Sequence, residues 1–243
     1  MRLDKALANS GFGSRTEVKD FIRSGRVSLA GEILRDPAAS ISQEQASLLC
    51  LDGEILTVRR YLYYLLNKPA GLVTAMNSRE ANIGELLPVF FGQKKITPVG
   101  RLDKDTTGLL LLTNHGELQH RLLSPRYGIP RRYYVEVQVL DHPFNDADVE
   151  QVAIGVRLND AELSRPANLA ILSPTAAYLE LREGKFHEVK RMMHALGKEV
   201  TKLHRESYGS VRLHEEVTGS LRALTEDEIL SLLASVRLLD PLD

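Results

Sequence analysis

The feature that most constrains the fold of this chain is a run of four leucines, Leu109 to Leu112, directly after a polar loop. Successive apolar side chains of this kind are typical of a strand that is buried on both faces. Residues 100–108, which form the loop, read Gly-Arg-Leu-Asp-Lys-Asp-Thr-Thr-Gly. A buried strand holds the polar side chains of such a loop in place, as catalysis requires. Asp103 is therefore the first candidate for a catalytic residue.

Composition excludes several other classes of protein. With 243 residues, 43% of them hydrophobic and 26% charged, the chain has the composition of an ordinary globular protein. No apolar run approaches the roughly 20 residues of a membrane-spanning helix, and the amino terminus lacks the apolar core of a signal peptide. Cys50 is the only cysteine, which excludes an intramolecular disulfide and a cysteine-based zinc site. We predict a cytoplasmic protein that does not contact membranes, and we expect a monomer.

The net charge of −1 does not indicate a nucleic-acid partner, but the basic residues are clustered along the chain. The distribution of charge matters more than its sum, because a single basic patch can attract a phosphate backbone. Solvated helix faces are the alternative interpretation of each cluster. The three clusters are Arg15, Lys19, Arg23 and Arg26; Arg121, Arg126, Arg131 and Arg132; and Lys185, Lys190, Arg191, Lys198, Lys202 and Arg205.

Residues 1–58 are predicted to form a small domain of short helices followed by a small sheet. Ser14 and Glu17 have the spacing of a capping box that begins a helix, and Gly25 is placed to end it. Alternation then predicts a strand at residues 26–29 and its antiparallel partner at residues 32–34.

The predicted helix of this small domain has one basic face. Arg15, Lys19, Arg23 and Arg26 are spaced by four, four and three residues, so we expect them to lie together, opposite the apolar side chains. Such a face suits a phosphate backbone.

Residues 59–243 are predicted to form a second, larger domain. We expect strands at 61–67, 72–74, 108–113, 133–140 and 176–182, and helices at 83–91, 117–123, 147–154 and 189–196. Strands and helices do not alternate strictly, so the pattern favours an α+β fold with a mixed, largely antiparallel sheet. The first domain would then be a small α/β RNA-binding module.

Two resemblances to known families support this division. The opening Arg-Leu-Asp-Lys at residues 2–5, Gly-Ser-Arg at 13–15, Gly-Arg-Val at 25–27 and Gly31 resemble the S4-type RNA-binding domain. Four further motifs, in order, resemble the ribosomal-RNA pseudouridine synthases of the small-subunit group, and this resemblance covers nearly the whole chain. These motifs are residues 67–71, the loop that holds Asp103, residues 132–135 and residues 183–192.

The resemblance implies an enzyme that isomerises a specific uridine in ribosomal RNA, most often of the small subunit, to pseudouridine. His187 and Lys190 match the small-subunit group, whereas members that act on large-subunit RNA tend to have Asn and Arg there. Glu188 is a departure, because the family usually has Gln at this position. No cofactor or metal is expected, since the reaction is redox-neutral and moves one bond. A synthase for large-subunit RNA and a catalytically silent RNA-binding factor in ribosome assembly stay open as alternatives.

The resemblance also implies roles for individual residues. Asp103 would be the catalytic carboxylate, which can attack the sugar, attack the base or remove a sugar proton. Tyr133 would lie against the target base, and alternation places Tyr134 on the opposite face of its strand. Lys190 would pair with the catalytic carboxylate. Predicted RNA contacts are Arg101, Thr106, Lys185, Arg191 and the basic helical face of Arg15, Lys19, Arg23 and Arg26; for Thr106, capping of the loop is the alternative.

Overall fold

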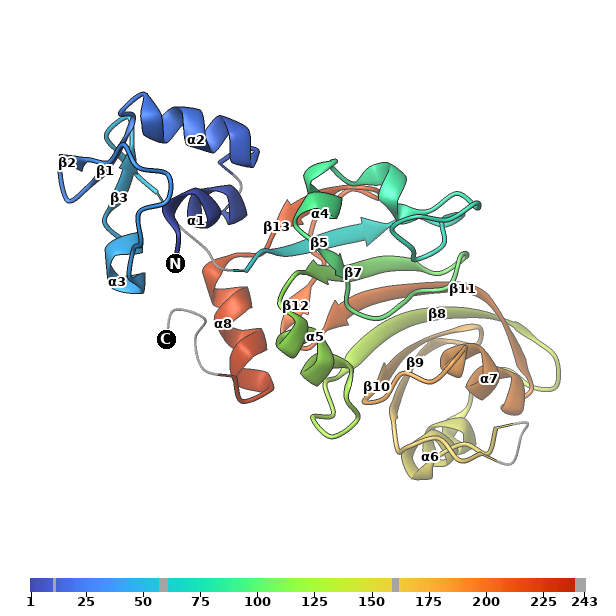
Figure 1. The fold of residues 1–243 in the computed structure, drawn as a ribbon. Helices are drawn as coiled ribbons and strands as arrows, with labels where there is room; N and C mark the ends of the chain where they lie inside the picture. The colour runs from blue at the N-terminus through green and yellow to red at the C-terminus, as the bar shows by residue number, and fades with distance from the viewer. Residues whose placement is uncertain (11, 57–60, 159–161, 239–243) are drawn as a thin grey trace. The chain divides into compact units, whose positions relative to one another are not determined.

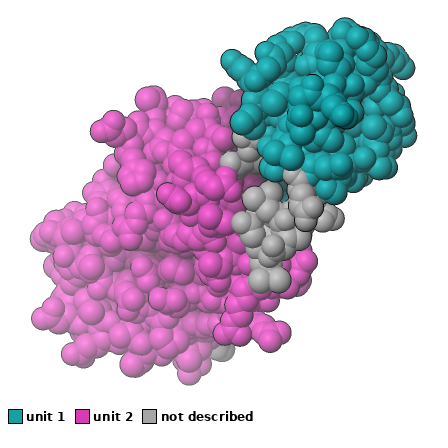
Figure 2. Space-filling model, turned by 90° about the vertical axis from the view of Figure 1, so that its left-hand side faces the viewer, with its two compact units in different colours: residues 1–62, 89–96, 239–243 teal, residues 63–88, 97–238 magenta. Residues whose placement is uncertain are grey.

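The computed structural model describes residues 1–243 except 11, 57–60, 159–161 and 239–243 (Figure 1). The described residues divide into two compact units, which Figure 2 shows in different colours. Met1–Leu62 and Val89–Ile96 belong to the first unit, and Tyr63–Pro88 and Thr97–Leu238 form the second. The predicted domain boundary between residues 58 and 59 lies outside the described residues. In the part of the chain that is described, no helix is long and apolar enough to span a bilayer.

The first unit packs its helices against a four-stranded antiparallel sheet of order β2-β1-β3-β4. Apolar side chains from the first three helices and the sheet, including Leu7, Ile22 and Leu49, share one buried cluster. The elements of this unit are α1 (Leu3–Asn9), α2 (Arg15–Arg23), β1 (Val27–Leu29), β2 (Glu32–Ile33), α3 (Gln43–Ala46), β3 (Leu49–Leu51), β4 (Glu54–Ile55) and α4 (Phe90–Gln93).

Helix α2 begins and ends as its sequence predicts. The Ser14 hydroxyl accepts a hydrogen bond from the Glu17 amide, and the Glu17 carboxylate accepts one from the Ser14 amide, which is a capping box. Beyond the helix, Gly25 has φ +79°, a left-handed conformation that glycine adopts without strain.

One prediction about the basic face is wrong. The helix ends at Arg23, so Arg26 does not lie on it. The Arg26 guanidinium instead lies over the ring of Phe21 and forms an ion pair of 2.5 Å with Asp52. The face that α2 presents therefore consists of Arg15, Lys19 and Arg23.

The second unit is built on a nine-stranded mixed sheet with the order β13-β5-β7-β11-β8-β10-β9, with β6 and β12 added at β7 and β11. Only the β7–β11 pair is parallel among the described pairs, so the predicted α+β class with a largely antiparallel sheet is confirmed. The elements are β5 (Tyr63–Lys68), η1 (Ile83–Leu86), β6 (Thr97–Pro98), β7 (Thr107–Thr113), α5 (Gly116–Leu123), β8 (Arg131–Val139), α6 (Asp146–Ile154), β9 (Asn168–Ser173), β10 (Ala176–Leu181), α7 (Glu188–Ala195), β11 (Lys198–Tyr208), β12 (Val211–Arg212), β13 (Leu221–Ala223) and α8 (Glu226–Ser235).

The leucine run forms the strand that the sequence predicts. Leu109 to Leu112 lie in β7, between β5 and β11, and all four are buried. Gly108 has φ +105°, and a Cβ at this position would come within 2.3 Å of the Arg205 carbonyl oxygen. Glycine therefore permits the close approach of β7 and β11 at the end of the Asp103 loop.

Two segments differ from the predictions. Residues 72–74 do not form a strand: Val73 makes a single bridge to Asn82, and the Thr74 hydroxyl is bonded to the backbone of Leu102 at 2.6 and 3.0 Å. The expected helix at 83–91 is divided into η1 and α4. Leu87 between them is extended, with ψ 141°, because a residue before proline disfavours the helical conformation.

Candidate active site

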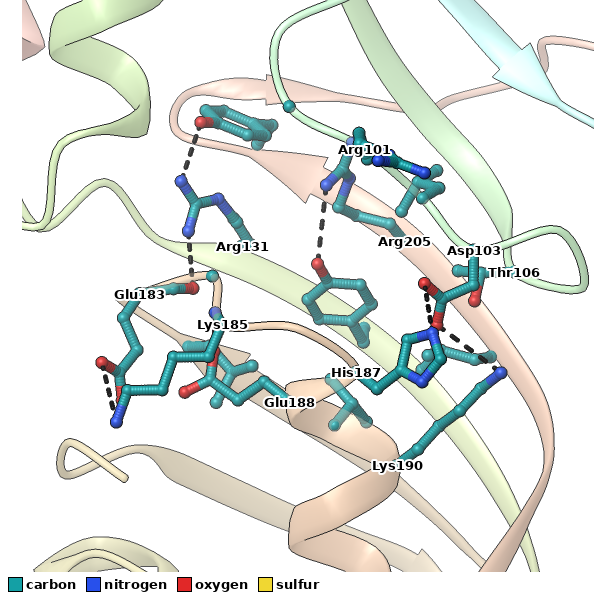
Figure 3. Close-up of a pocket in the computed structure, with 18 of the residues that line it drawn as sticks. Arg101, Asp103, Thr106, Arg131, Glu183, Lys185, His187, Glu188, Lys190 and Arg205 are labelled. Carbon is teal, nitrogen blue, oxygen red and sulfur yellow. Dashed lines mark hydrogen bonds and ion pairs between the residues drawn. The ribbon is translucent and has the colours of Figure 1, made fainter. Parts of the chain in front are cut away.

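A pocket in the second unit is lined by Leu123, at the end of α5, and by four longer segments that are distant in sequence (Figure 3). The loop of residues 99–106 forms one wall, and the others come from the start of β8, the residues around the start of α7, and β11. The pocket therefore brings together the three sequence motifs that hold Asp103, Tyr133 and Lys190, which all line it.

Asp103 lies in this pocket with two basic side chains beside it (Figure 3). Its side chain is 29% exposed. Its Oδ1 lies 3.4 Å from His187 Nε2, and its Oδ2 lies 3.5 Å from Lys190 Nζ. The Lys190 ammonium is closer to Asp105, at 2.7 Å from both carboxylate oxygens. Burial raises the pKa of Asp105, but the hydrogen bond and the charge of Lys190 lower it, and the pKa is held below its ordinary value. Lys190 thus lies within ion-pair distance of two carboxylates, Asp103 and the closer Asp105.

His187 is a residue of the site that the sequence analysis used only as a family marker. It precedes α7 with φ +47°, an uncommon conformation for a residue with a Cβ, and its ring stacks on Phe186 with centroids 3.8 Å apart. The left-handed backbone directs this imidazole to Asp103. Among the described residues, no three His, Cys, Asp or Glu side chains gather as a metal site requires.

Lys68 holds the Asp103 loop from beneath, and the sequence analysis did not single it out. The side chain is fully buried, and its ammonium donates to the carbonyl oxygens of Pro69, Asp103 and Thr106 at 2.9–3.0 Å and of Lys104 at 3.4 Å. Burial lowers the pKa of Lys68 to about 8, although Asp105 and Asp103 oppose the shift. In the sequence, Lys68 stands at the end of a predicted strand and within the family motif at residues 67–71.

Tyr133 forms part of the opposite wall, as strand alternation predicts. It is 8% exposed and lines the pocket, whereas Tyr134 lies on the other face of β8 with its ring edge against Tyr178. Arg205 of β11, which in the sequence is one member of a basic cluster, is also buried here. Its Nη1 lies 3.5 Å from the Tyr133 hydroxyl.

The predicted RNA contacts of this unit fall into two groups. Arg101 and Thr106 both line the pocket, and Arg101 is exposed. Thr106 is only 2% exposed and its amide donates to the Asp103 carbonyl, so Thr106 belongs to the interior of the loop. Lys185 and Arg191 both bind Glu162, at 2.8 and 3.2 Å. Arg191 does not line the pocket.

A pair of buried carboxyl groups, Glu183 and Glu188, forms a further part of the pocket wall. Glu183 accepts a hydrogen bond of 2.6 Å from the Arg165 amide. Glu188 Oε2 accepts one of 3.0 Å from the Lys185 amide, while its Oε1 has no donor partner among the described residues. Burial and a hydrogen bond with Glu183 raise the pKa of Glu188 to about 7. The protonated carboxyl can donate to Glu183, as the amide of a glutamine would.

Replacement of Glu188 by Gln is expected to stabilise the protein at pH 8. The folded state binds the Glu188 proton more tightly than the unfolded chain, so the contribution to stability is full below pH 4.5 and is lost as the pH rises to about 7. Because one pKa unit corresponds to about 1.4 kcal/mol, we expect a gain on the order of 2 kcal/mol that is larger at pH 8 than at pH 5.

Urea unfolding of both proteins at the two pH values measures this difference. Glu180→Gln is a matched control, since this more exposed carboxylate of β10 is paired with Arg182. An equal gain for Glu188→Gln at both pH values would show that the proton is not the cause.

Comparison with known proteins identifies the family to which this site belongs. A sequence profile described as RNA pseudouridylate synthase matches residues 62–195, and an S4 domain profile matches residues 1–45. The chain belongs to the RNA pseudouridylate synthase family. The identification of a synthase with an amino-terminal S4 domain from the sequence motifs is therefore confirmed, and the chain is an enzyme that isomerises uridine in RNA.

Relatives of this pseudouridine synthase match it over nearly their whole length. The Bacillus subtilis protein named "Uncharacterized RNA pseudouridine synthase YtzG" is 39% identical over 235 residues, which cover 94% of this chain and 97% of that protein. Ribosomal small subunit pseudouridine synthase A of Escherichia coli is 39% identical over 237 residues, covering 95% and 99%. A crystal structure of a pseudouridylate synthase, 34% identical, has a TM-score of 0.66 and covers 96% of this chain and 99% of that one.

Proposed function

We propose that this synthase converts one specific uridine of small-subunit ribosomal RNA to pseudouridine, with Asp103 as the catalytic carboxylate. The observation that carries the proposal is the placement of Asp103, half-buried in a pocket between His187 and Lys190. The reaction breaks the bond between the sugar carbon C1′ and the base nitrogen N1, turns the base and rejoins it through C5. A carboxylate can stabilise or capture the positive charge at C1′ while the base is detached.

Two neighbours support the catalytic role of Asp103. His187 and Lys190 each place a basic side chain beside one of its two oxygens, which holds the carboxylate in position in the pocket. Tyr133 offers an aromatic ring and a hydroxyl to an extruded pyrimidine, and such stacking is worth about 1–3 kcal/mol. Arg101, exposed beside Asp103, is placed to contact the RNA around the target base.

The small subunit is favoured as the source of the RNA by two observations. The relative from Escherichia coli, which covers nearly all of this chain, carries the small subunit in its name. The chain also has His187 and Lys190 at the positions where the resemblance separates the small-subunit group from the large-subunit one.

Mapping of pseudouridines in ribosomal RNA from cells with and without this protein tests the proposal. One small-subunit site should disappear on deletion and return on complementation with the wild type. Loss of a large-subunit site instead would assign the enzyme to the other subunit. An unchanged map would favour the alternative of a catalytically silent assembly factor.

The basic face of α2 is proposed to supply affinity for RNA rather than chemistry. Arg15→Gln together with Arg23→Gln should weaken RNA binding and flatten its salt dependence, because each lost phosphate contact lowers the slope by about 0.7–0.9. We therefore expect a change in slope of about 1.5. Filter binding to a small-subunit RNA transcript at several salt concentrations measures it.

Arg26→Gln is the matched control for this experiment. It removes a positive charge from the same unit, but from a residue that lies off the helix in an ion pair with Asp52. If Arg26→Gln changed the slope as much per charge, affinity would follow the total charge of the unit and not the face of α2.

A further inference from the structure

Arg205 is a buried cation in the wall of the pocket, and its charge is not matched by a carboxylate. The residue is 2% exposed. Its Nε donates to the Leu109 carbonyl at 2.7 Å, and its Nη1 reaches only the Tyr133 hydroxyl, at 3.5 Å. Among the described residues, its Nη2 has no hydrogen-bond partner and no carboxylate forms an ion pair with the guanidinium, which lies over the ring of Tyr208 at 5.2 Å from the centroid.

The other buried cations of this unit are bonded differently. Lys68 donates to four backbone carbonyls, Arg131 to two carbonyls and a phenol, and Lys198 to a buried carboxylate at 2.9 Å. A buried polar nitrogen without a hydrogen-bond partner is costly, and of these four buried cations only Arg205 has one, its Nη2. Arg205 is the exception, and it lies against the residue that we place beside the base.

The reaction supplies the negative charge that Arg205 lacks. When the N1–C1′ bond breaks, its electron pair stays with N1, and the charge spreads to the carbonyl oxygens O2 and O4. An electron pair of the base then forms the new bond between C5 and C1′. The proton on C5 leaves, and N1 gains a proton. Asp103 can attack the sugar, attack the base or remove a sugar proton. Each of these three routes leaves extra negative charge on the base. A fixed cation nearby lowers the barrier because it interacts more strongly with the transition state than with the ground state.

The Tyr133 hydroxyl connects Arg205 to the base. A guanidinium has no acceptor, so in the Arg205–Tyr133 contact the phenol oxygen accepts. The hydrogen of this hydroxyl has no acceptor among the described residues, and Tyr133 lines the pocket. It is therefore free to be donated to a carbonyl oxygen of the base.

We propose that Arg205 is a positioning residue for this isomerisation, which fixes the Tyr133 hydroxyl as a donor and stabilises negative charge on the detached uracil. The proposal rests on the proposed placement of the base against Tyr133. It assigns Arg205 to the rate of the chemical step and not to RNA affinity.

Single-turnover kinetics at saturating RNA, with tritium release from C5-labelled uridine in small-subunit RNA, test the proposal. Arg205→Gln retains a donor for the Leu109 carbonyl but removes the charge, and should slow the reaction by about 100-fold with affinity within threefold. Arg205→Lys keeps the charge and should retain more of the rate. Thermal unfolding followed by circular dichroism shows that both variants are folded under the assay conditions. Lys202→Met, which removes an exposed cation of the same strand, should keep the wild-type rate.

A double-mutant cycle separates this role from a purely structural one. In the wild type, Arg205→Gln should lower the single-turnover rate by about 100-fold. In a Tyr133→Phe background, the same substitution should lower the rate by less than about tenfold, because the hydroxyl through which Arg205 acts is absent. An undiminished loss, a loss confined to RNA affinity, or equal rates for the Gln and Lys variants would each overturn the proposal. If the wild type released tritium and Asp103→Asn did not, such an outcome would leave the proposed function standing.

Discussion

Replacement of Asp103 by Asn should lower turnover by roughly four orders of magnitude, the scale seen when one member of a catalytic set is removed. Asparagine has nearly the same shape and can still bond to His187, but it carries no charge and is a poor nucleophile. RNA affinity should stay within threefold, because contacts to phosphates dominate it. Tritium release from C5-labelled uridine measures turnover, and filter binding measures affinity.

Asp105→Asn provides a matched control two residues away. Asp105 is the closer partner of Lys190, but its side chain is 71% exposed. Its replacement leaves Lys190 to Asp103 alone and should reduce turnover by no more than about tenfold, because no group that reacts is removed. If Asp105→Asn abolished turnover and Asp103→Asn did not, the two carboxylates would have exchanged roles.

Replacement of Lys68 by Met should disable the enzyme without touching a residue that reacts. Four carbonyl groups of the Asp103 loop and its surroundings would lose the ammonium as a donor, and only those of Asp103 and Lys104 would keep a backbone amide donor from the described residues. Hydrogen bonds to a charged group contribute about 1.5–3 kcal/mol each, and removal of a buried charge offsets part of this loss. We expect a destabilisation of about 2–4 kcal/mol in urea unfolding. Turnover of the folded protein should fall about 100-fold, because the loop no longer holds the carboxylate in place.

Lys198→Met separates loss of stability from loss of the site. Lys198 is equally buried, but it is paired with Asp148 at 2.9 Å and does not line the pocket. Its replacement should destabilise the protein by about 3–5 kcal/mol, since it leaves a buried carboxylate unpaired. Single-turnover rates should be measured under conditions in which Lys68→Met and Lys198→Met are both folded. The rate of Lys198→Met should then be near that of the wild type, and the rate of Lys68→Met should not. A wild-type rate for Lys68→Met would show that the loop keeps its geometry without the ammonium.

Local patterns predicted much of the fold and the part of the pocket that depends on local order. The capping box at Ser14 and Glu17 and the buried strand at Leu109 to Leu112 follow from local pattern alone, and so does the placement of Tyr133 and Tyr134 on opposite faces of their strand. Position relative to a buried strand also indicated that Asp103 would be well fixed.

The remaining features depend on contacts between distant segments. Nothing near Lys68 in sequence shows that the carbonyl groups of residues 103–106 surround its ammonium. The pairing of Arg205 with Tyr133 requires β11 to lie beside β8. Arg26 was misplaced because its spacing of three residues from Arg23 continues the helical pattern. The helix itself ends at Arg23, and Gly25 follows it in a left-handed conformation.

The parallel pairing of β7 with β11 also constrains how the enzyme comes into existence. His204 pairs with Thr107, 97 residues earlier in the chain, and no hairpin can make this contact. Closure of so long a loop is slow, because its entropy must be lost before the contact contributes any energy. During synthesis, Asp103 leaves the ribosome long before Lys190 and Arg205 do. The nascent chain therefore holds Asp103 before it holds the residues of α7 and β11 that line the same pocket, and the pocket is complete only in a chain that extends past β11.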